Sequence, residues 1–81
     1  MIIRKVPPGG ARWHAGERYM VAIGNISQLS ENRTKVDVFI RSPTGNVSYR
    51  VGDGRQMGNF HPIWVSFRGK RITVEELLRM T

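Results

Sequence analysis

One alternating stretch limits the fold of this chain more than any other feature. Val36, Val38 and Ile40 occupy every second position of segment 34–41, which is the period of a strand with one buried face. The segment 42–46 that follows consists of residue types that favour turns, and the alternation resumes over 47–51. The sequence therefore predicts a β-hairpin over residues 34–51.

The register of this hairpin follows from which pairing gathers the apolar side chains on one side. One register sets Val38 opposite Val51 and Ile40 opposite Tyr49, so that one side is wholly apolar. A three-residue loop would instead set Val38 opposite Arg50. We predict the first register, which leaves the other side with Lys35, Asp37, Phe39, Arg41, Ser48 and Arg50. This cationic face with one aromatic ring is the main functional indication in the sequence.

The length and composition favour a single small domain with a thin core over residues 1–81. The apolar content of 40% argues against wholesale disorder, and the chain has no cysteine to form disulfides or Cys-based zinc sites. No apolar stretch resembles a signal peptide or reaches the length of a membrane span. We therefore expect a cytoplasmic protein with no membrane partner.

The net charge is the unusual feature of the composition. Thirteen Lys and Arg against six Asp and Glu give a formal net charge of +7 in only 81 residues. Ten of the thirteen are Arg, the residue type suited to bidentate contacts with phosphates and base edges. An anionic polymer is the partner that this balance predicts, and the alternative is a surface that is merely cationic and soluble.

The remaining segments divide the chain into further strands and connections. We predict an edge strand over 1–6, a loop over 11–18, a strand over 19–26, a loop over 27–33, a mobile glycine-containing connection over 52–59 and a strand over 60–67. Pro62 cannot donate to a ladder, so the start of the last of these strands should lie at an edge or bulge.

The C-terminal segment carries the most specific local signals. Arg68-Gly69 is typical of a two-residue turn, and such a turn places Val65 opposite Ile72. The next residues, from Thr73 to Glu76, match a capping box at the start of a helix.

A helix of about two turns is unstable alone in water. Leu77 and Leu78 must therefore pack on the sheet.

Together these elements predict a mainly β fold of four to five antiparallel strands with a short C-terminal helix. A small SH3-like or OB-like barrel fits the short strands and regular turns, and it is the architecture we prefer. The second half alone is similar in layout to the three-stranded sheet and helix of AP2-type and integrase arm-binding domains.

Three groups of residues are candidates for binding nucleic acid. The first is the outward sheet face, the second a basic hairpin tip, and the third a basic-aromatic loop. Their members are Lys35, Phe39, Arg41, Arg50 and Trp64; Arg68, Lys70 and Arg71; and Arg12 and Trp13. Each has a structural alternative: Phe39 packed under the C-terminal helix, a solvated turn at Gly69, and Trp13 closing one end of a barrel.

Catalysis has little support in the sequence. His14, with Glu17 nearby, and His61 are the residues from which acid-base cleavage of RNA could be built, and nothing in the sequence brings the two histidines together. Two histidines without cysteine or paired carboxylates do not predict a metal site. We expect no enzyme activity, no metal and no cofactor.

The leading hypothesis is a nucleic-acid-binding module, such as a small regulator or a phage or mobile-element accessory protein, for DNA or RNA. The alternative is a protein-interaction module or inhibitor that docks on an acidic partner through Trp13, Trp64, Tyr49 and arginines. Exposed strand edges could pair between two copies of the chain, so a homodimer is also compatible with the sequence.

Overall fold

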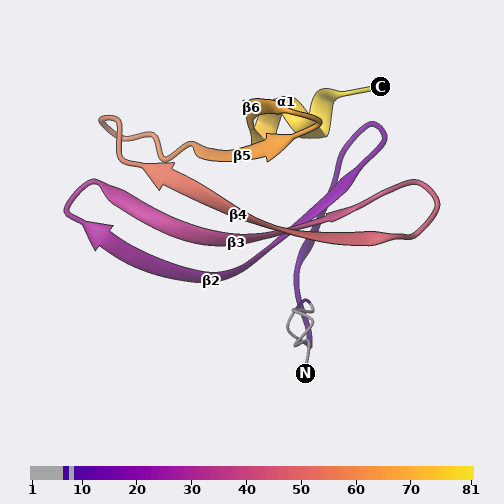
Figure 1. Cartoon of the computed structure of the whole chain (residues 1–81), viewed down its shortest axis with the longest axis horizontal. Coiled ribbons are helices and arrows are strands. Elements are labelled where there is room, and N and C mark those ends of the chain that lie inside the picture. The colour runs from indigo at the N-terminus through magenta and orange to yellow at the C-terminus, as the bar shows by residue number, and fades with distance from the viewer. Residues whose placement is uncertain (1–6, 8) are drawn as a thin grey trace.

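The computed structural model describes residue 7 and residues 9–81, so the edge strand expected over 1–6 lies outside the described residues. The described part contains strands that run antiparallel to their neighbours and one short helix (Figure 1). These elements are β1 (Trp13–Ala15), β2 (Met20–Ser30), β3 (Arg33–Arg41), β4 (Val47–Arg55), β5 (Ile63–Phe67), β6 (Lys70–Thr73) and α1 (Val74–Arg79).

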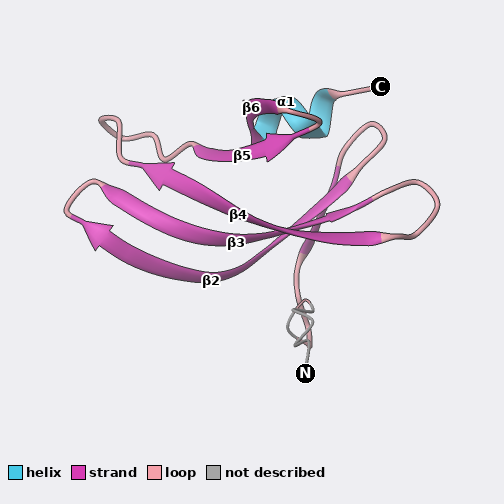
Figure 2. Ribbon diagram, in the orientation of Figure 1, coloured by secondary structure: helices cyan, strands magenta, loops and turns pink. Residues whose placement is uncertain are grey.

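The sheet is a meander in which each strand pairs with the next one along the chain, in the order β1-β2-β3-β4-β5-β6. The long strands β2, β3 and β4 are strongly twisted, and β5, β6 and α1 lie together on one side of them (Figure 2). The predicted mainly β fold with a short C-terminal helix is confirmed. The described sheet has six strands and is not closed, with β1 and β6 as its edges, so the barrel that we preferred is not confirmed.

The predicted register of the β3–β4 hairpin is wrong by one residue. Val38 lies opposite Arg50 and Phe39 lies opposite Tyr49, which is the pairing that the sequence argument rejected. The three-residue loop 43–45 sets this register: the Ser42 amide donates to the Asn46 carbonyl at 2.9 Å. The predicted register would hold for a hairpin with only one buried face. In the structure, both faces are covered near the middle of β3.

The main core lies on the face that carries Val36, Val38 and Ile40, which we call the core face. Side chains of β5, β6 and α1 cover the same face of β2 and β3, and Leu77 of the helix is fully buried there. The buried residues of this cluster are Tyr19, Val21, Val36, Val38, Ile40, Val65, Phe67, Ile72 and Leu77. The expectation that Leu77 and Leu78 pack on the sheet is confirmed.

The opposite face, called the outer face, has a small buried cluster of its own. Trp13, Ala22, Phe39 and Tyr49 follow one another across β1 to β4, and the rings of Phe39 and Tyr49 are 5.4 Å apart. The Tyr49 hydroxyl donates to the carboxylate of Asp37 at 2.7 Å. This row explains why part of the loop expected over 11–18 is strand β1: Trp13 packs as a member of the sheet.

Strands β2 and β4 both extend further than the sequence predicts. The loop expected over 27–33 is strand up to Ser30, and the mobile connection expected over 52–59 is strand up to Arg55. Two positions of β4 are occupied by glycine, Gly52 and Gly54, because neighbouring groups approach the backbone closely there. A Cβ at Gly52 would lie 2.6 Å from the Trp64 carbonyl oxygen, and one at Gly54 would lie 2.6 Å from the Thr34 hydroxyl. Glycine is needed here for space and not for flexibility.

The predicted C-terminal turn and the N-cap role of Thr73 are confirmed. Arg68 and Gly69 both have positive φ, 52° and 78°, as a type I′ turn requires, and Val65 lies opposite Ile72. The Thr73 hydroxyl accepts the amide of Glu76 at 3.1 Å and so caps the helix.

A search of the described residues for a helix long and apolar enough to cross a membrane finds none.

Candidate functional site

A row of side chains crosses the outer face at one end of the sheet. Lys35 of β3 lies opposite Asp53 of β4, and Asp53 lies opposite Trp64 of β5. The alternation of a strand places these three side chains on the same face. Ser27 and Thr73 extend the row over β2 and β6. Five strands therefore present neighbouring side chains at this level.

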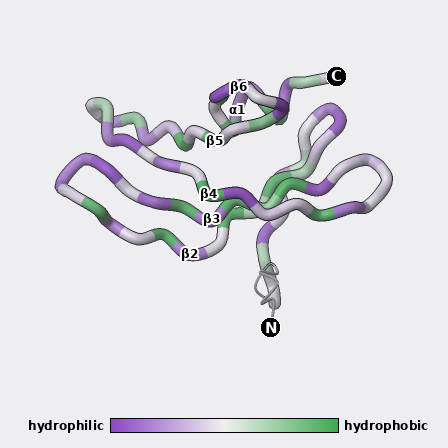
Figure 3. The backbone as a smooth tube through the Cα atoms, viewed as in Figure 1, coloured by the Kyte–Doolittle hydropathy of each residue, from purple (hydrophilic) through white to green (hydrophobic). Residues whose placement is uncertain are grey.

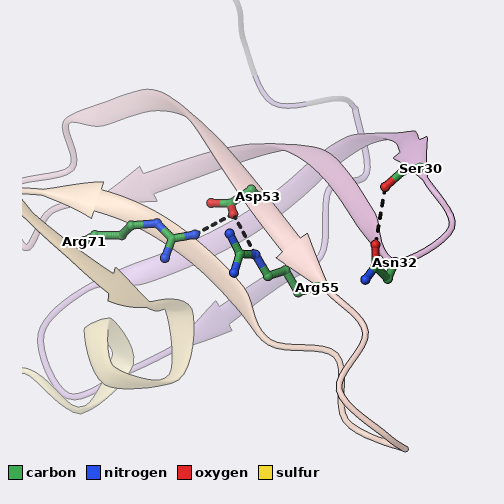
Figure 4. Close-up of polar contacts among 5 residues, drawn as sticks. All are labelled: Ser30, Asn32, Asp53, Arg55 and Arg71. Atoms are coloured by element: carbon green, nitrogen blue, oxygen red, sulfur yellow. Dashed lines mark hydrogen bonds and ion pairs between the residues drawn. The ribbon is translucent and has the colours of Figure 1, made fainter.

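Asp53 is the carboxylate on which two arginines of this face converge (Figure 4). Its Oδ2 atom lies 2.5 Å from an Nη of Arg71 and 3.9 Å from the Nε of Arg55. The guanidinium of Arg71 also lies over the indole ring of Trp64, 4.8 Å from its centroid. The ion pair and the ring contact together hold Arg71 over Trp64, while half of its side chain stays accessible to solvent.

Arg33 completes the group, because it lies opposite Arg55 in the β3–β4 ladder. We call Arg33, Lys35, Arg55 and Arg71, with Asp53 and Trp64 among them, the cationic patch. All four cations are exposed, and like-charged residues placed directly opposite each other are unfavourable in a sheet. One carboxylate offsets only part of this charge. The patch therefore keeps a positive surplus that a bound polyanion would relieve.

The other residues predicted for the outer face are separated from the patch. Arg41 is exposed on the outer face of β3, but it lies six residues beyond Lys35, or about 20 Å along the strand. Trp13 is half-buried in β1, and Arg12 is exposed immediately before it.

Phe39 has only 2% of its surface exposed, so its ring is not available to stack on a base. Phe39 is therefore packed, which was the structural alternative predicted for this residue. Its partners are Tyr49 and the backbone at Gly24, where an added Cβ would lie 2.9 Å from the ring. The helix contributes Leu77 to the core on the opposite face, so the expectation that Phe39 lies under the helix is wrong.

Arg50 is also misplaced by the sequence argument, because the shifted register turns it onto the core face. Its guanidinium carbon lies 5.8 Å from the centroid of the Phe67 ring, and its Nε is buried without a hydrogen-bond acceptor. Arg68 lies against the same ring at 5.3 Å and donates to the Tyr19 hydroxyl at 2.7 Å. These two arginines form a second basic group, on the other side of the sheet from the patch.

The hairpin tip does not act as one cluster of three cations. Arg68 packs over Phe67 on the core face, Arg71 reaches Asp53 on the outer face, and Lys70 is exposed opposite Phe67. Alternation along β6 sends successive side chains to opposite faces. The sequence prediction therefore placed Arg71 in the right segment but with the wrong neighbours.

The two histidines lie at opposite ends of the sheet. His14 pairs with Val21, which lies opposite Ile40, whereas His61 lines a pocket beside Thr34 and Gly54. Thr34 and Ile40 are six residues apart on β3, or about 20 Å. Among the described residues, no group of three His, Cys, Asp or Glu is placed to hold a metal ion.

A pocket of about 370 Å³ lies on the core face next to the cationic patch. Ile26, Val36 and Ile63 supply apolar surface to it, while Arg55 and His61 lie among its polar lining. Its lining residues come in part from the β2–β3 turn and the β4–β5 connection. Figure 1 shows this turn and this connection at the same end of the sheet.

Three residues of the patch, Arg33, Arg55 and Asp53, were not predicted as site residues from the sequence. Arg33 and Arg55 lay in segments that were expected to be loops, so their positions opposite each other were not visible. The signal that could have found them is the length of the hairpin, since a ladder extended past Thr34 must bring both arginines to the outer face.

Comparisons of the chain with protein-family models, with curated proteins and with solved structures find no match.

Proposed function

We propose that this protein binds nucleic acid through the cationic patch. The observation that carries the proposal is the arrangement of Arg33, Lys35, Arg55 and Arg71 around one carboxylate on a single exposed face. Phosphates follow one another along a nucleic-acid strand, so a surface with several adjacent cations can contact more than one of them.

The Arg71–Trp64 pair gives this surface more than charge. Asp53 and the indole ring hold the guanidinium of Arg71 in one orientation, so little side-chain freedom is lost when it binds a phosphate. Trp64 is half-buried, and its ring lies beneath Arg71. Trp64 therefore supports Arg71 from below, while a nucleic-acid strand contacts the exposed cations around the ring.

The overall charge supports the same proposal. A net charge of +7 in a chain of this size attracts polyanions over distances of about a Debye length. Arg41 and the Arg50–Arg68 group, which lie away from the patch, contribute to this attraction. As part of this proposal we place the protein in the cytoplasm, as a small non-enzymatic regulator or accessory protein of the phage or mobile-element kind.

Fluorescence anisotropy with labelled single-stranded and duplex oligonucleotides over a salt series tests the proposal. Four phosphate contacts predict a slope of log K against log salt concentration of roughly −3 to −4. Lys35→Ala should weaken binding and reduce the magnitude of the slope by about 0.7–0.9. Arg41→Ala is the matched control, because it removes the same charge from the same strand outside the patch.

Two outcomes would refute the proposal in different ways. No binding at 50 mM salt would remove the function altogether. Equal losses for Lys35→Ala and Arg41→Ala would show that binding follows net charge and that the patch is not the site.

A second candidate function, docking on an acidic partner protein, is favoured by apolar side chains at the same end of the sheet. Four side chains, those of Ile26, Leu29, Met57 and Phe60, are 53–62% exposed and lie on the C-terminal half of β2 and on the β4–β5 connection. Figure 3 shows the end of β2 and this connection at the same end of the molecule. Exposed apolar side chains that gather in one place are typical of interaction surfaces.

Capture from a nuclease-treated lysate at 0.5 M salt, with Phe60→Ser as the control bait, tests this second candidate. A stoichiometric acidic protein that is lost with Phe60→Ser would support it. Identical captures by the two baits would contradict it.

A further inference from the structure

The pocket beside the cationic patch has the construction of a ligand site. Its volume, about 370 Å³, lies within the range of roughly 300–1,000 Å³ that is usual for small-molecule pockets. Ile26, Val36 and Ile63 form apolar walls, and the amides of Gln28, Asn32 and Gln56 stand among the polar lining. Apolar walls accept a flat ring, and amide groups both donate and accept hydrogen bonds at its edge.

A bulge in β2 creates this pocket. The ladder between β2 and β3 changes register between Ile23 and Ile26, so Ile26 lies opposite Val36 and on the core face. Without the shift, strict alternation from Met20 would place Ile26 on the outer face. Ile26 is 62% exposed, which is unusual for a residue opposite a core valine. The bulge thus delivers an apolar side chain to the pocket without filling it.

Arg55 joins the pocket to the patch. Its Nε lies 3.9 Å from Asp53 on the outer face, and the same side chain lines the pocket. Arg33 lies directly opposite it. A ligand ring in the pocket would therefore have Arg55 beside it, while Glu31 also belongs to the lining and Arg33 lies across the ladder on the outer face. The guanidinium of Arg55 favours a ligand that carries negative charge next to a ring.

We propose that the pocket holds an unstacked base of single-stranded nucleic acid, while Arg33 and Arg55 bind the phosphates on either side of that base. This inference rests on the proposed function and names the form of nucleic acid that the site takes. A base within a duplex is stacked and paired and cannot enter the pocket, so the protein binds single strands in preference to duplexes.

The test compares a labelled 12-nucleotide single strand, the duplex of the same sequence and an oligomer of abasic deoxyribose phosphates, all at 150 mM salt. We expect the single strand to bind about tenfold more tightly than either of the other two probes. The abasic oligomer offers the same phosphates without bases, so its affinity measures the contribution of the patch alone.

The variants Ile26→Ser and Leu29→Ser form a matched pair. Both residues lie on β2, they are 62% and 59% exposed, and Ile26 lines the pocket whereas Leu29 is not among its lining residues. We expect Ile26→Ser to lower single-strand affinity about five- to tenfold and to leave abasic binding unchanged, and Leu29→Ser to change neither. Thermal melting of both variants checks that the fold is kept.

The outcomes separate the two proposals. If the single strand, the duplex and the abasic oligomer bind equally and both variants behave alike, the base pocket is refuted while nucleic-acid binding stands. If no probe binds, the proposed function fails and the base pocket fails with it. If Ile26→Ser weakens all three probes equally, the residue supports the fold near the patch and the base pocket is again refuted.

Discussion

The close approach of β5 to Gly52 leads to a prediction that separates two views of segment 52–59. As a mobile connection, the segment would tolerate alanine at Gly52. In the structure, a Cβ there lies 2.6 Å from the Trp64 carbonyl oxygen, whereas ordinary van der Waals contact begins at 3.4 Å. The atom it meets is backbone, so the clash cannot be relieved by turning a side chain. Strand β4 or β5 must move.

Overpacking of this kind costs about 1–3 kcal/mol of unfolding free energy. A domain of this size has roughly 4–12 kcal/mol in total, and each kcal/mol shifts the melting temperature by about 4–8 °C. We therefore expect Gly52→Ala to lower Tm by about 5–20 °C, measured by circular dichroism. The reduced freedom of the unfolded chain offsets only about 0.4–1 kcal/mol of the cost.

Gly9→Ala is the control, because no atom of the described residues lies within 4 Å of its Cβ position and its φ does not require glycine. It should leave Tm unchanged or raise it slightly. A Tm for Gly52→Ala within 2 °C of the wild-type value would show that β5 does not approach β4 at this point. The row from Lys35 through Asp53 to Trp64 would then lose its structural basis.

Three further substitutions test other parts of the structure. Leu77→Ala should cost about 2–5 kcal/mol in urea unfolding because the side chain is fully buried; a loss below 1 kcal/mol would contradict the packing of α1 on the sheet. Thr73→Ala should cost about 0.5–2 kcal/mol by removing the acceptor for the Glu76 amide, whereas Thr73→Ser should restore most of it. Asp53→Asn should steepen the salt dependence of oligonucleotide binding, because it removes the negative charge among the patch cations while the amide oxygen can still accept from Arg71; an unchanged slope would contradict the placement of Asp53 within the patch.

Local signals were sufficient to predict the C-terminal third of the chain. Arg68-Gly69 adopts the two positive φ values that its turn needs, and that turn alone places Val65 opposite Ile72. The capping hydroxyl of Thr73 acts on an amide three residues away. Each of these features depends on neighbours within a few residues, so the local sequence contains the information required to predict them.

The register of the central hairpin depended on contacts that lie far away in the sequence. Gathering Val38 and Val51 on one side was the better choice for a hairpin buried on a single face. In the sheet, Ala22 from β2 and Tyr49 from β4 pack beside Phe39 on the outer face, so that face is buried too. With two buried faces, the apolar pattern no longer selects one register, and the three-residue loop 43–45 does.

The sequence alone determined the chemistry of this protein: an arginine-rich surplus of charge, a mainly β chain and a capped C-terminal helix. Only the tertiary structure decided where that charge lies, because a shift of one residue moved Arg50 to the core face, and an extended ladder brought Arg33 opposite Arg55. The physical reason is the two-residue period of a strand. Side-chain direction alternates at every position, so a binding face is set by strand pairing and by bulges, which depend on distant parts of the chain.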